Sequence, residues 1–244
     1  MVERDYVLAH VVAHLPEVQM PGGGRLVFKG GTALRFVYIG RYRYSADLDF
    51  TVLDGAADDA ATALSMAVAA ARAHAGFPTL EIQTAVPGPA RLAYVGPLGS
   101  AKIRRVKLDL AVDEHVVTVA QGRMLEGIWS DLPAPADFDV YPVDEITAEK
   151  LRCVIQRVEC RDLYDLYRLT EDLRVNLSEL TGLFESKARA KGIDPDLFPT
   201  RFEERTEKYE ERWEQEMREH LMDPPRFDDV LRVVRRNLRQ AGLV

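Results

Sequence analysis

The sequence predicts an α/β (α+β) protein in which an N-terminal mixed sheet flanked by helices is followed by a C-terminal helical domain. In the first half, short segments of alternating apolar residues are interspersed with helical patterns, which is typical of a sheet covered by helices. From Asp144 onward almost every segment repeats its apolar residues at helical spacing. Proline and aspartate are frequent in 122–143. We therefore predict domains at 1–121 and 122–244.

The first domain is expected to begin with a helix that the PGGG sequence at 21–24 ends. Helices are predicted at 3–19, 32–39 and 56–75, and strands at 25–29, 47–53, 79–85, 90–95 and 103–112, with a PGP turn at 87–89. In the second domain a strand-like piece at 139–143 precedes helices at 144–158, 161–170, 178–191, 196–221 and 226–241.

Composition indicates an ordinary globular protein, with 47% hydrophobic residues in a chain of 244. No run approaches the roughly 20 apolar residues that span a bilayer, and the start of the chain lacks a signal-peptide pattern. We expect a cytoplasmic protein without a membrane partner. Cys153 and Cys160 lie seven apart in a helical pattern, so we expect buried thiols on one helix face and no disulfide.

The net charge of −7 argues against nucleic-acid binding over the whole surface but leaves room for a local basic groove. Three basic clusters are present: Arg35, Arg41 and Arg43; Lys102, Arg104, Arg105 and Lys107; and Arg232, Arg235, Arg236 and Arg239. The first two flank the acidic pair described next and are candidates to meet phosphates. The third is predicted to be a solvated helix face.

The segment from Lys29 to Phe50 carries the strongest functional pattern. Gly30 and Gly31 open a predicted helix, where backbone N–H groups and the helix dipole favour a phosphate. Asp47 and Asp49 lie two apart on a predicted strand, so their carboxylates share one face. A phosphate cradle beside paired carboxylates is what metal-dependent nucleotidyl transfer requires, because Mg²⁺ prefers few carboxylates together with phosphate oxygens and water.

A third carboxylate is usual in such a site, and Asp109 supplies one on the predicted strand 103–112. It lies between two leucines, so burying it unpaired would cost several kcal/mol. Asp109 is therefore expected to face a metal ion, a cation or solvent. We favour the metal ion, with an aspartate on the wet face of an edge strand as the alternative. The other Asp-x-Asp pairs, Asp137/Asp139 and Asp194/Asp196, follow no glycine pair and are predicted to lie in solvated turns.

Other chemistries lack their motifs. The chain contains no GxxxxGK[ST] loop, GxGxxG fingerprint, GxSxG elbow or HExxH sequence. His10 and His14 are four apart, but no glutamate follows His10, so a zinc site is not predicted and surface or partly buried histidines are expected.

FKGGTALR followed by RYSADLDF resembles the AbiEii/AbiGii toxin family, nucleotidyltransferases of the DNA-polymerase-β-like superfamily that also include the MenT toxins. DEITAEKLRCVIQR and CRDLYDLYRL are similar to the family's later motifs, so the resemblance covers most of 26–170. It implies a nucleotidyltransferase fold for the N-terminal sheet. The implied activity is Mg²⁺-dependent transfer of a nucleoside monophosphate from an NTP by the toxin of a toxin–antitoxin pair, with a cognate antitoxin as partner. In the MenT branch the acceptor is the tRNA 3′ end.

The resemblance also implies roles for particular residues. Gly30 and Gly31 would contact the triphosphate, Asp47 and Asp49 would hold metal with Asp109, and Ser45 occupies the family's small-hydroxyl position. We assign Lys29, Thr32 and Arg43, which lie beside them, to nucleotide binding. Lys150 and Asp162 match family residues implicated in activity. The alternative for these last two residues, and for the neighbouring Asp165, is a salt-bridged contact between helices.

Two other functions remain open from sequence. One is a nucleotidyltransferase that acts on a protein or on a small molecule such as an aminoglycoside. The other is a catalytically inactive module of the same fold that binds a nucleotide or a protein partner. The acidic set of Asp47, Asp49 and Asp109 argues for the enzyme, because an inactive relic has no reason to retain it.

Overall fold

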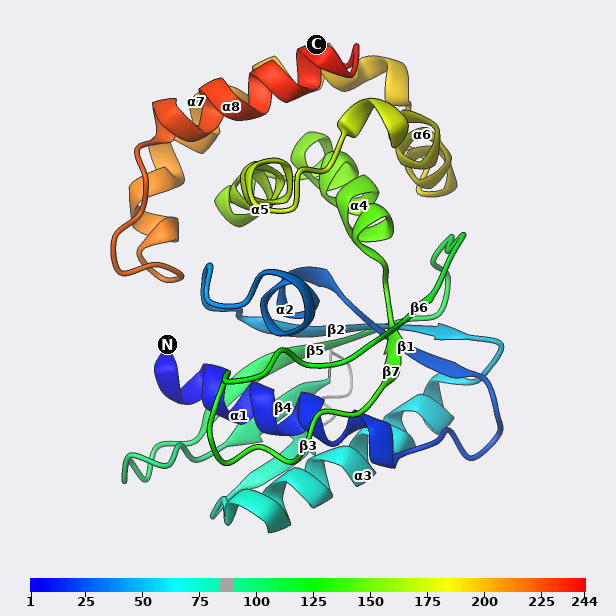
Figure 1. Ribbon diagram of the computed structural model, residues 1–244, viewed down its shortest axis with the longest axis vertical. Helices are drawn as coiled ribbons and strands as arrows, with labels where there is room; N and C mark the ends of the chain where they lie inside the picture. The colour runs from blue at the N-terminus through cyan, green and yellow to red at the C-terminus, as the bar shows by residue number, and fades with distance from the viewer. Residues whose placement is uncertain (84–89) are drawn as a thin grey trace. The chain divides into compact units, whose positions relative to one another are not determined.

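A computed structural model describes residues 1–83 and 90–244 (Figure 1). The chain separates into two compact units, which are described individually below. The first comprises 1–114 and 119–141, and the second comprises 115–118 and 142–244. The domains predicted from sequence, 1–121 and 122–244, stay a prediction. Strand β7 (Phe138–Val140) pairs with β1 (Arg25–Lys29), so the sheet of the first unit extends beyond residue 121.

In the described part of the first unit, seven strands form one mixed sheet in the order β3-β4-β5-β2-β1-β7-β6. The remaining strands are β2 (Asp47–Leu53), β3 (Leu80–Gln83), β4 (Arg91–Tyr94), β5 (Arg104–Ala111) and β6 (Ala120–Gly122). Strand β2 is central, antiparallel to β1 and parallel to β5. The predicted α/β class is therefore confirmed.

Helices cover both faces of this sheet. Figure 1 shows α2 (Gly30–Ala33) on one face and α1 (Val2–Ala13) and α3 (Ala57–Ala75) on the other. The apolar side chains of β2 point toward α1 and α3, and Leu48 and Phe50 are at most 1% exposed there. Burying one face of β2 in this core holds the strand rigidly, which fixes the position of the acidic side chains on its other face.

Two predicted elements of the first unit differ from the structure. The helix predicted at 3–19 ends at Ala13, and after His14 a 3₁₀ turn at Leu15–Glu17 follows, which contains Pro16. The helix predicted at 32–39 begins at Gly30 as α2 and continues as a π-helix, η2 (Leu34–Ile39). The short strand β6 was not predicted, and the predicted PGP turn at 87–89 lies outside the described residues.

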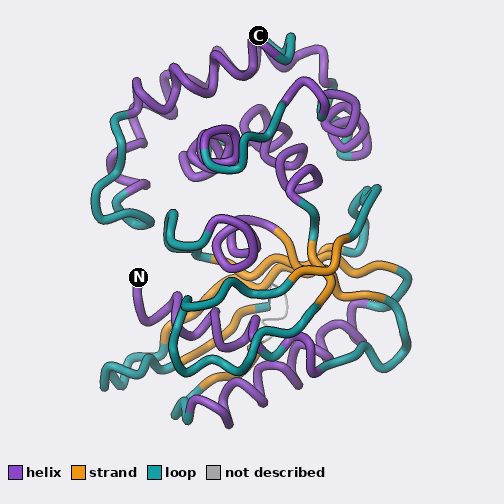
Figure 2. Tube along the Cα trace, viewed as in Figure 1, coloured by secondary structure: helices purple, strands orange, loops and turns teal. Residues whose placement is uncertain are grey.

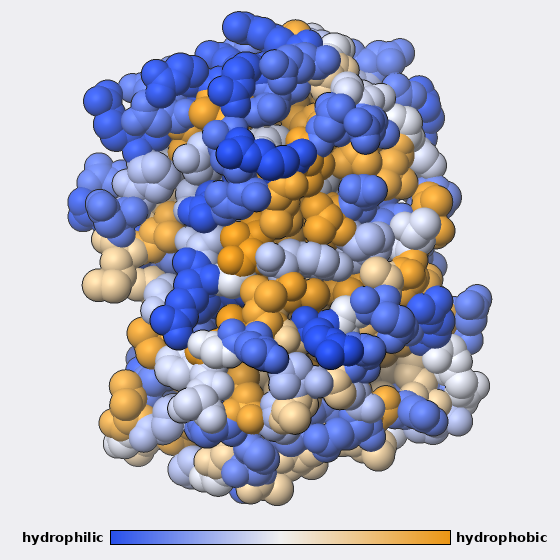
Figure 3. Space-filling model, in the orientation of Figure 1, coloured by the Kyte–Doolittle hydropathy of each residue, from blue (hydrophilic) through white to orange (hydrophobic). Residues whose placement is uncertain are grey.

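The second unit is built from helices and connecting segments (Figure 2). Its helices are α4 (Val143–Gln156), α5 (Cys160–Glu171), α6 (Thr181–Ala190), α7 (Phe198–Met217) and α8 (Phe227–Gln240), with 3₁₀ turns η3 (Leu177–Glu179) and η4 (Pro195–Leu197). Phe184, Phe198 and Phe202 pack in its core, with ring centroids 5.4 and 5.9 Å apart. The outer surfaces of α7 and α8 are strongly hydrophilic (Figure 3).

A four-residue segment, 115–118, belongs to the second unit although it precedes β6 in the chain. The backbone N–H groups of Val117 and Thr118 donate to the carboxylate of Glu145 at 2.8 and 2.9 Å. Lys187 of α6 pairs with the same carboxylate at 2.5 Å and donates to the carbonyl of His115. A buried ion pair therefore fastens this segment to α4 and α6.

The two cysteines are buried free thiols, as expected, but they do not share a helix face. Cys153 lies in α4 and Cys160 begins α5, because α4 ends at Gln156. In the described part of the chain, no helix combines the length and apolar character needed to cross a bilayer.

Candidate active site

The three predicted metal-ligating aspartates lie on one face of the sheet of the first unit. Asp47 and Asp49 alternate with the buried Leu48 and Phe50 along β2. In the parallel pairing of β2 with β5, Asp109 is level with Asp49 and Lys107 is level with Asp47. Paired residues on neighbouring strands project from the same face of a sheet, so the three aspartates share one face, with Asp109 on the strand next to the Asp47/Asp49 pair.

The glycine pair lies directly against this face. Gly30 has a φ of +76°, and a β-carbon added there would approach the Asp49 carboxylate to 2.5 Å. A β-carbon at Gly31 would meet the guanidinium of Arg43 at 2.1 Å. Any side chain at either position would therefore collide with a residue of the site, which requires glycine at both. Glycine there also lets a phosphate approach the backbone closely.

Thr32 connects the glycine helix to the acidic strand. Its side chain is fully buried, and its Oγ1 lies 2.5 Å from the hydroxyl of Ser45 and donates to the backbone carbonyl of Asp47. A hydrogen bond to a buried carbonyl restrains the backbone where β2 begins. Thr32 and Ser45, both predicted to bind nucleotide, thus contact each other and position Asp47.

Two of the predicted nucleotide-binding cations are buried at this face. The guanidinium of Arg43 lies 5.3 Å from the ring centre of Tyr42 and donates to the carbonyl of Tyr44 at 3.2 Å. The ammonium of Lys29 lies 3.3 Å from the carboxylate of Glu114 and 5.4 Å from the Tyr141 ring centre. Both side chains are therefore held in fixed positions beside the carboxylates.

This donor set fits a divalent cation. Carboxylate oxygens are the ligands Mg²⁺ prefers, and one or two of them suffice when phosphate oxygens and water complete the shell. Asp109 is already ion-paired with Lys107 at 3.1 Å. Among the described residues, no three acidic, thiol or imidazole groups are arranged around a single point. The pair on β2 is therefore the better candidate for direct metal ligation.

The other two predicted catalytic residues, Lys150 and Asp162, belong to the second unit, where they contact each other. Lys150 of α4 lies 2.6 Å from the Asp162 carboxylate and 2.7 Å from the Asp165 carboxylate, both on α5. Arg157 adds a second cation at 2.8 Å from Asp162. Both aspartates are fully buried, so this ion cluster ties α4 to α5.

The electrostatics of that cluster favour charged aspartate. Burial would raise the pKa of Asp162, but the neighbouring Lys150 ammonium and Arg157 guanidinium outweigh it and hold the pKa below its usual range. Burial, reinforced by the Asp162 charge, raises the pKa of the nearby Cys153 thiol to about 11. Cys153 therefore remains a protonated thiol at neutral pH and is not a nucleophile.

Comparison with known proteins identifies the family. The family model described as "Nucleotidyl transferase AbiEii toxin, Type IV TA system" matches residues 15–233. The chain belongs to the AbiEii toxin family. The resemblance noted from the sequence is therefore confirmed, and the match extends beyond 26–170 in both directions.

Seven chains of solved structures match the fold of this AbiEii-family protein. One is MenT4, a nucleotidyltransferase toxin from Mycobacterium tuberculosis H37Rv, with a TM-score of 0.56 and 23% identity. The match covers 73% of this chain and 63% of MenT4, so the two proteins share a fold over part of their lengths. A search of curated proteins finds no match.

Other residues that the sequence analysis of this AbiEii-family chain singled out lie in buried or ion-paired positions away from the acidic strand. His10 is fully buried, not on the surface or partly buried as expected, and burial lowers its pKa to about 4. Asp139 is not in a solvated turn, because it lies on β7 and forms a two-pronged ion pair with Arg25 at 2.7 and 2.9 Å. As predicted, the C-terminal basic cluster lies on an exposed helix face, where Arg232, Arg235 and Arg236 form surface ion pairs.

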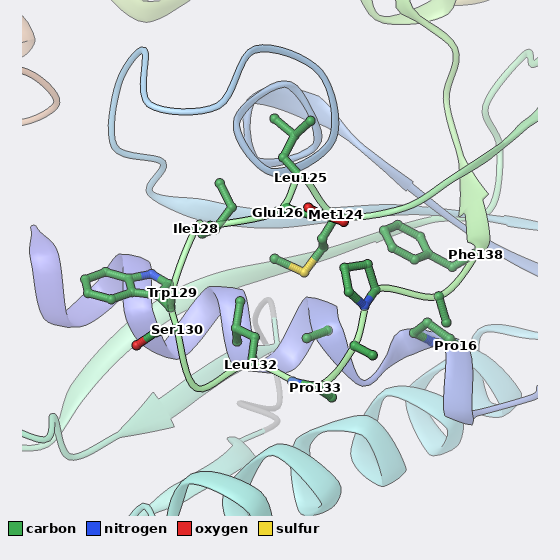
Figure 4. A pocket seen from close by; sticks show the side chains of 15 residues that line it. Pro16, Met124, Leu125, Glu126, Ile128, Trp129, Ser130, Leu132, Pro133 and Phe138 are labelled. Atoms are coloured by element: carbon green, nitrogen blue, oxygen red, sulfur yellow. The ribbon is translucent and has the colours of Figure 1, made fainter.

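A separate apolar cavity of about 250 Å³ lies in the first unit (Figure 4). Met124 and Phe138 point toward its centre, and Leu132 and Pro133 line the opposite wall. None of the predicted site residues lines it. The candidate active site is therefore distinct from this cavity.

Sequence reasoning missed the partners that hold the site cations. Arg35, grouped with the cations expected to meet phosphates, is instead buried and paired with Asp5 of α1. Asp5 lies on the apolar face of its helix, among Leu8 and Val12, and a buried acid requires a partner. That position is the signal that could have identified it, whereas nothing near Glu114 in the sequence indicates its contact with Lys29.

Proposed function

We propose that this AbiEii-family protein is a Mg²⁺-dependent nucleotidyltransferase toxin that transfers a nucleoside monophosphate from an NTP to the 3′ end of tRNA. The observation that carries the proposal is the juxtaposition of Asp47 and Asp49 with the Gly30–Gly31 helix start, with Asp109 level on the next strand. Family membership supports the reaction class. The AbiEii/MenT resemblance of the sequence motifs supports the acceptor.

In this proposal Asp47 and Asp49 hold the metal, and the bound ion neutralises charge on the triphosphate and polarises the phosphorus that is attacked. Arg43 and the N–H groups at the start of α2 bind phosphate oxygens. The acceptor hydroxyl oxygen bonds to the α-phosphorus and the bond to pyrophosphate breaks. The hydroxyl proton passes to a carboxylate on this face, for which Asp109 is the candidate, or to water.

Lys150 and Asp162 serve the reaction in this proposal through the α4–α5 ion cluster. The ion pairs within the second unit support a positioning role, because Lys150 is already neutralised by two carboxylates. A cognate antitoxin is the proposed partner, as the type IV toxin–antitoxin description of the family implies. The cytoplasm is the proposed location, because tRNA and NTPs are found there.

The test is label transfer. Purified protein is incubated with Mg²⁺, each of the four α-³²P-labelled NTPs, and total tRNA or protein extract. Asp49→Asn, which keeps the size of the side chain, is compared with Asp137→Asn, which removes a carboxylate that pairs with Arg123 on the surface. We expect label on tRNA with wild type and Asp137→Asn, and a loss of at least about 100-fold with Asp49→Asn.

The other outcomes decide between the remaining functions. Label on a protein or on a small molecule would keep the enzyme and refute the tRNA acceptor. NTP binding without transfer to any acceptor would favour the inactive binding module. Full transfer by Asp49→Asn would refute the assignment of the carboxylates, since this residue is central to the proposed metal site.

A further inference from the structure

One arginine of the first unit is buried inside the turn that precedes the acidic strand. Arg35 lies in η2 and is 6% exposed. Its Nε donates to one carboxylate oxygen of Asp5, and its Nη2 donates to the other at 2.8 Å. This two-pronged pair joins η2 to α1, and Asp5 is itself only 1% exposed. Removing either partner would leave the other charge buried and unpaired.

The rest of the Arg35 guanidinium organises the turn at 40–44. Its Nη1 donates to the carbonyl of Arg43 at 3.0 Å and to the carbonyl of Gly40 at 3.4 Å. The guanidinium also lies 4.9 Å from the ring centre of Tyr44. Within the turn, the Tyr42 N–H already donates to the Gly40 carbonyl at 2.9 Å, so Arg35 adds a second bond there and a separate one to the Arg43 carbonyl.

The same turn carries Arg43, whose guanidinium lies against Gly31. The backbone carbonyl of Arg43 is fixed by Arg35, while its guanidinium lies beside Gly31 and over Tyr42. Moving the turn would therefore move this guanidinium. A guanidinium placed in advance binds phosphate better than one that must be ordered when the ligand arrives.

We propose that Arg35, with Asp5 as its counter-ion, is a positioning residue that fixes the 40–44 turn and thereby holds Arg43 where it binds the triphosphate. This inference rests on the proposed nucleotidyltransferase function and specifies how its nucleotide site is built. Lysine cannot replace Arg35, because one ammonium cannot serve a carboxylate in two-pronged geometry and two backbone carbonyls at once.

The kinetic test is a double-mutant cycle on NTP use. Arg35→Lys, Arg43→Gln and the double variant are compared with wild type, with Arg25→Lys as matched control. Arg25 also forms a two-pronged pair with an aspartate, but that pair joins β1 to β7 and involves no residue of the 40–44 turn. We expect Arg35→Lys to raise the KM for NTP by about tenfold, with kcat falling much less. The double variant is expected to be no worse than Arg43→Gln, because the two residues act through one contact.

A second measurement does not depend on activity. Hydrogen exchange of the backbone amides at 40–46 should become faster in Arg35→Lys and in Asp5→Asn, and should remain as in wild type in Arg25→Lys. Additive effects on KM, or unchanged exchange at 40–46, would overturn the proposal. If wild type itself neither binds nor transfers NTP, the proposed function fails. The exchange experiment would then still decide whether Arg35 holds the turn.

Discussion

Gly30→Ala should damage the active site far more than it damages the fold. The φ of Gly30 is +76°, so an alanine there costs about 1–2 kcal/mol in backbone strain. For a chain of this length that corresponds to a fall in Tm of roughly 2–8 °C. The added β-carbon would also lie 2.5 Å from the Asp49 carboxylate, which must retreat by roughly 1 Å to reach ordinary contact. Misplacing a reacting group by that distance costs on the order of 100-fold in rate.

Gly76→Ala is a control that separates the displacement of the Asp49 carboxylate from the loss of stability caused by backbone strain. Gly76 ends α3 with a φ of +66°, and a β-carbon there would meet nothing within 4 Å. Both variants should therefore lose similar stability, measured by thermal unfolding. Only Gly30→Ala should lose label transfer, measured at a temperature well below both transitions. Equal transfer by the two variants would refute the reasoning that Gly30 makes room for the carboxylate.

Lys150→Met leaves the carboxylates of Asp162 and Asp165 buried with one cation fewer, so the free energy of unfolding in urea should fall by about 3–5 kcal/mol. A loss no larger than that of Arg218→Met, which removes an exposed ion pair, would contradict this. EDTA should abolish label transfer and leave the Tm unchanged, because the metal proposed at Asp47 and Asp49 serves the reaction rather than the packing of the core. A large fall in Tm would show a structural metal. Burial lowers the pKa of His10 from 6.5 to about 4, so the unfolded chain takes up this proton first as the pH falls. Stability should therefore decline between pH 6.5 and 4, by at most about 1.4 kcal/mol per pH unit from this residue. In urea titrations, the free energy of unfolding of His10→Gln should fall less steeply with decreasing pH than that of wild type. An identical dependence on pH would refute the lowered pKa of His10.

Local sequence patterns predicted the strands whose formation depends on their own alternation of apolar residues. Strands 25–29 and 47–53 match β1 and β2 residue for residue, because an apolar pattern between glycines and turns leaves little alternative. Strand β6 has three residues, one of them glycine, and exists only because β7 offers it a hydrogen-bonding edge. No pattern within so short a segment could have predicted it.

The candidate site shows the same limit. Alternation along each strand predicted that Asp47 and Asp49 share one face, but the level position of Asp109 beside Asp49 follows from the parallel pairing of β2 with β5, which no local pattern indicates. The pairing of Lys107 with Asp109 lies within one strand, so it was readable from the sequence in principle. The contacts of Lys29 with Glu114, and of Arg35 with Asp5, join residues 85 and 30 positions apart. Such contacts follow from the tertiary fold, which the spacing of residues does not encode.

The capture of segment 115–118 by α4 and α6 has a consequence for how such proteins can be divided or recombined. The chain passes from one unit to the other at three points, so no single cut separates it into two complete parts. A helical half taken from 142 onward would lack the backbone N–H groups that satisfy Glu145. A chimera that takes its helical unit from a relative would therefore also need segment 115–118 of that relative, inserted separately between the strands of the first unit.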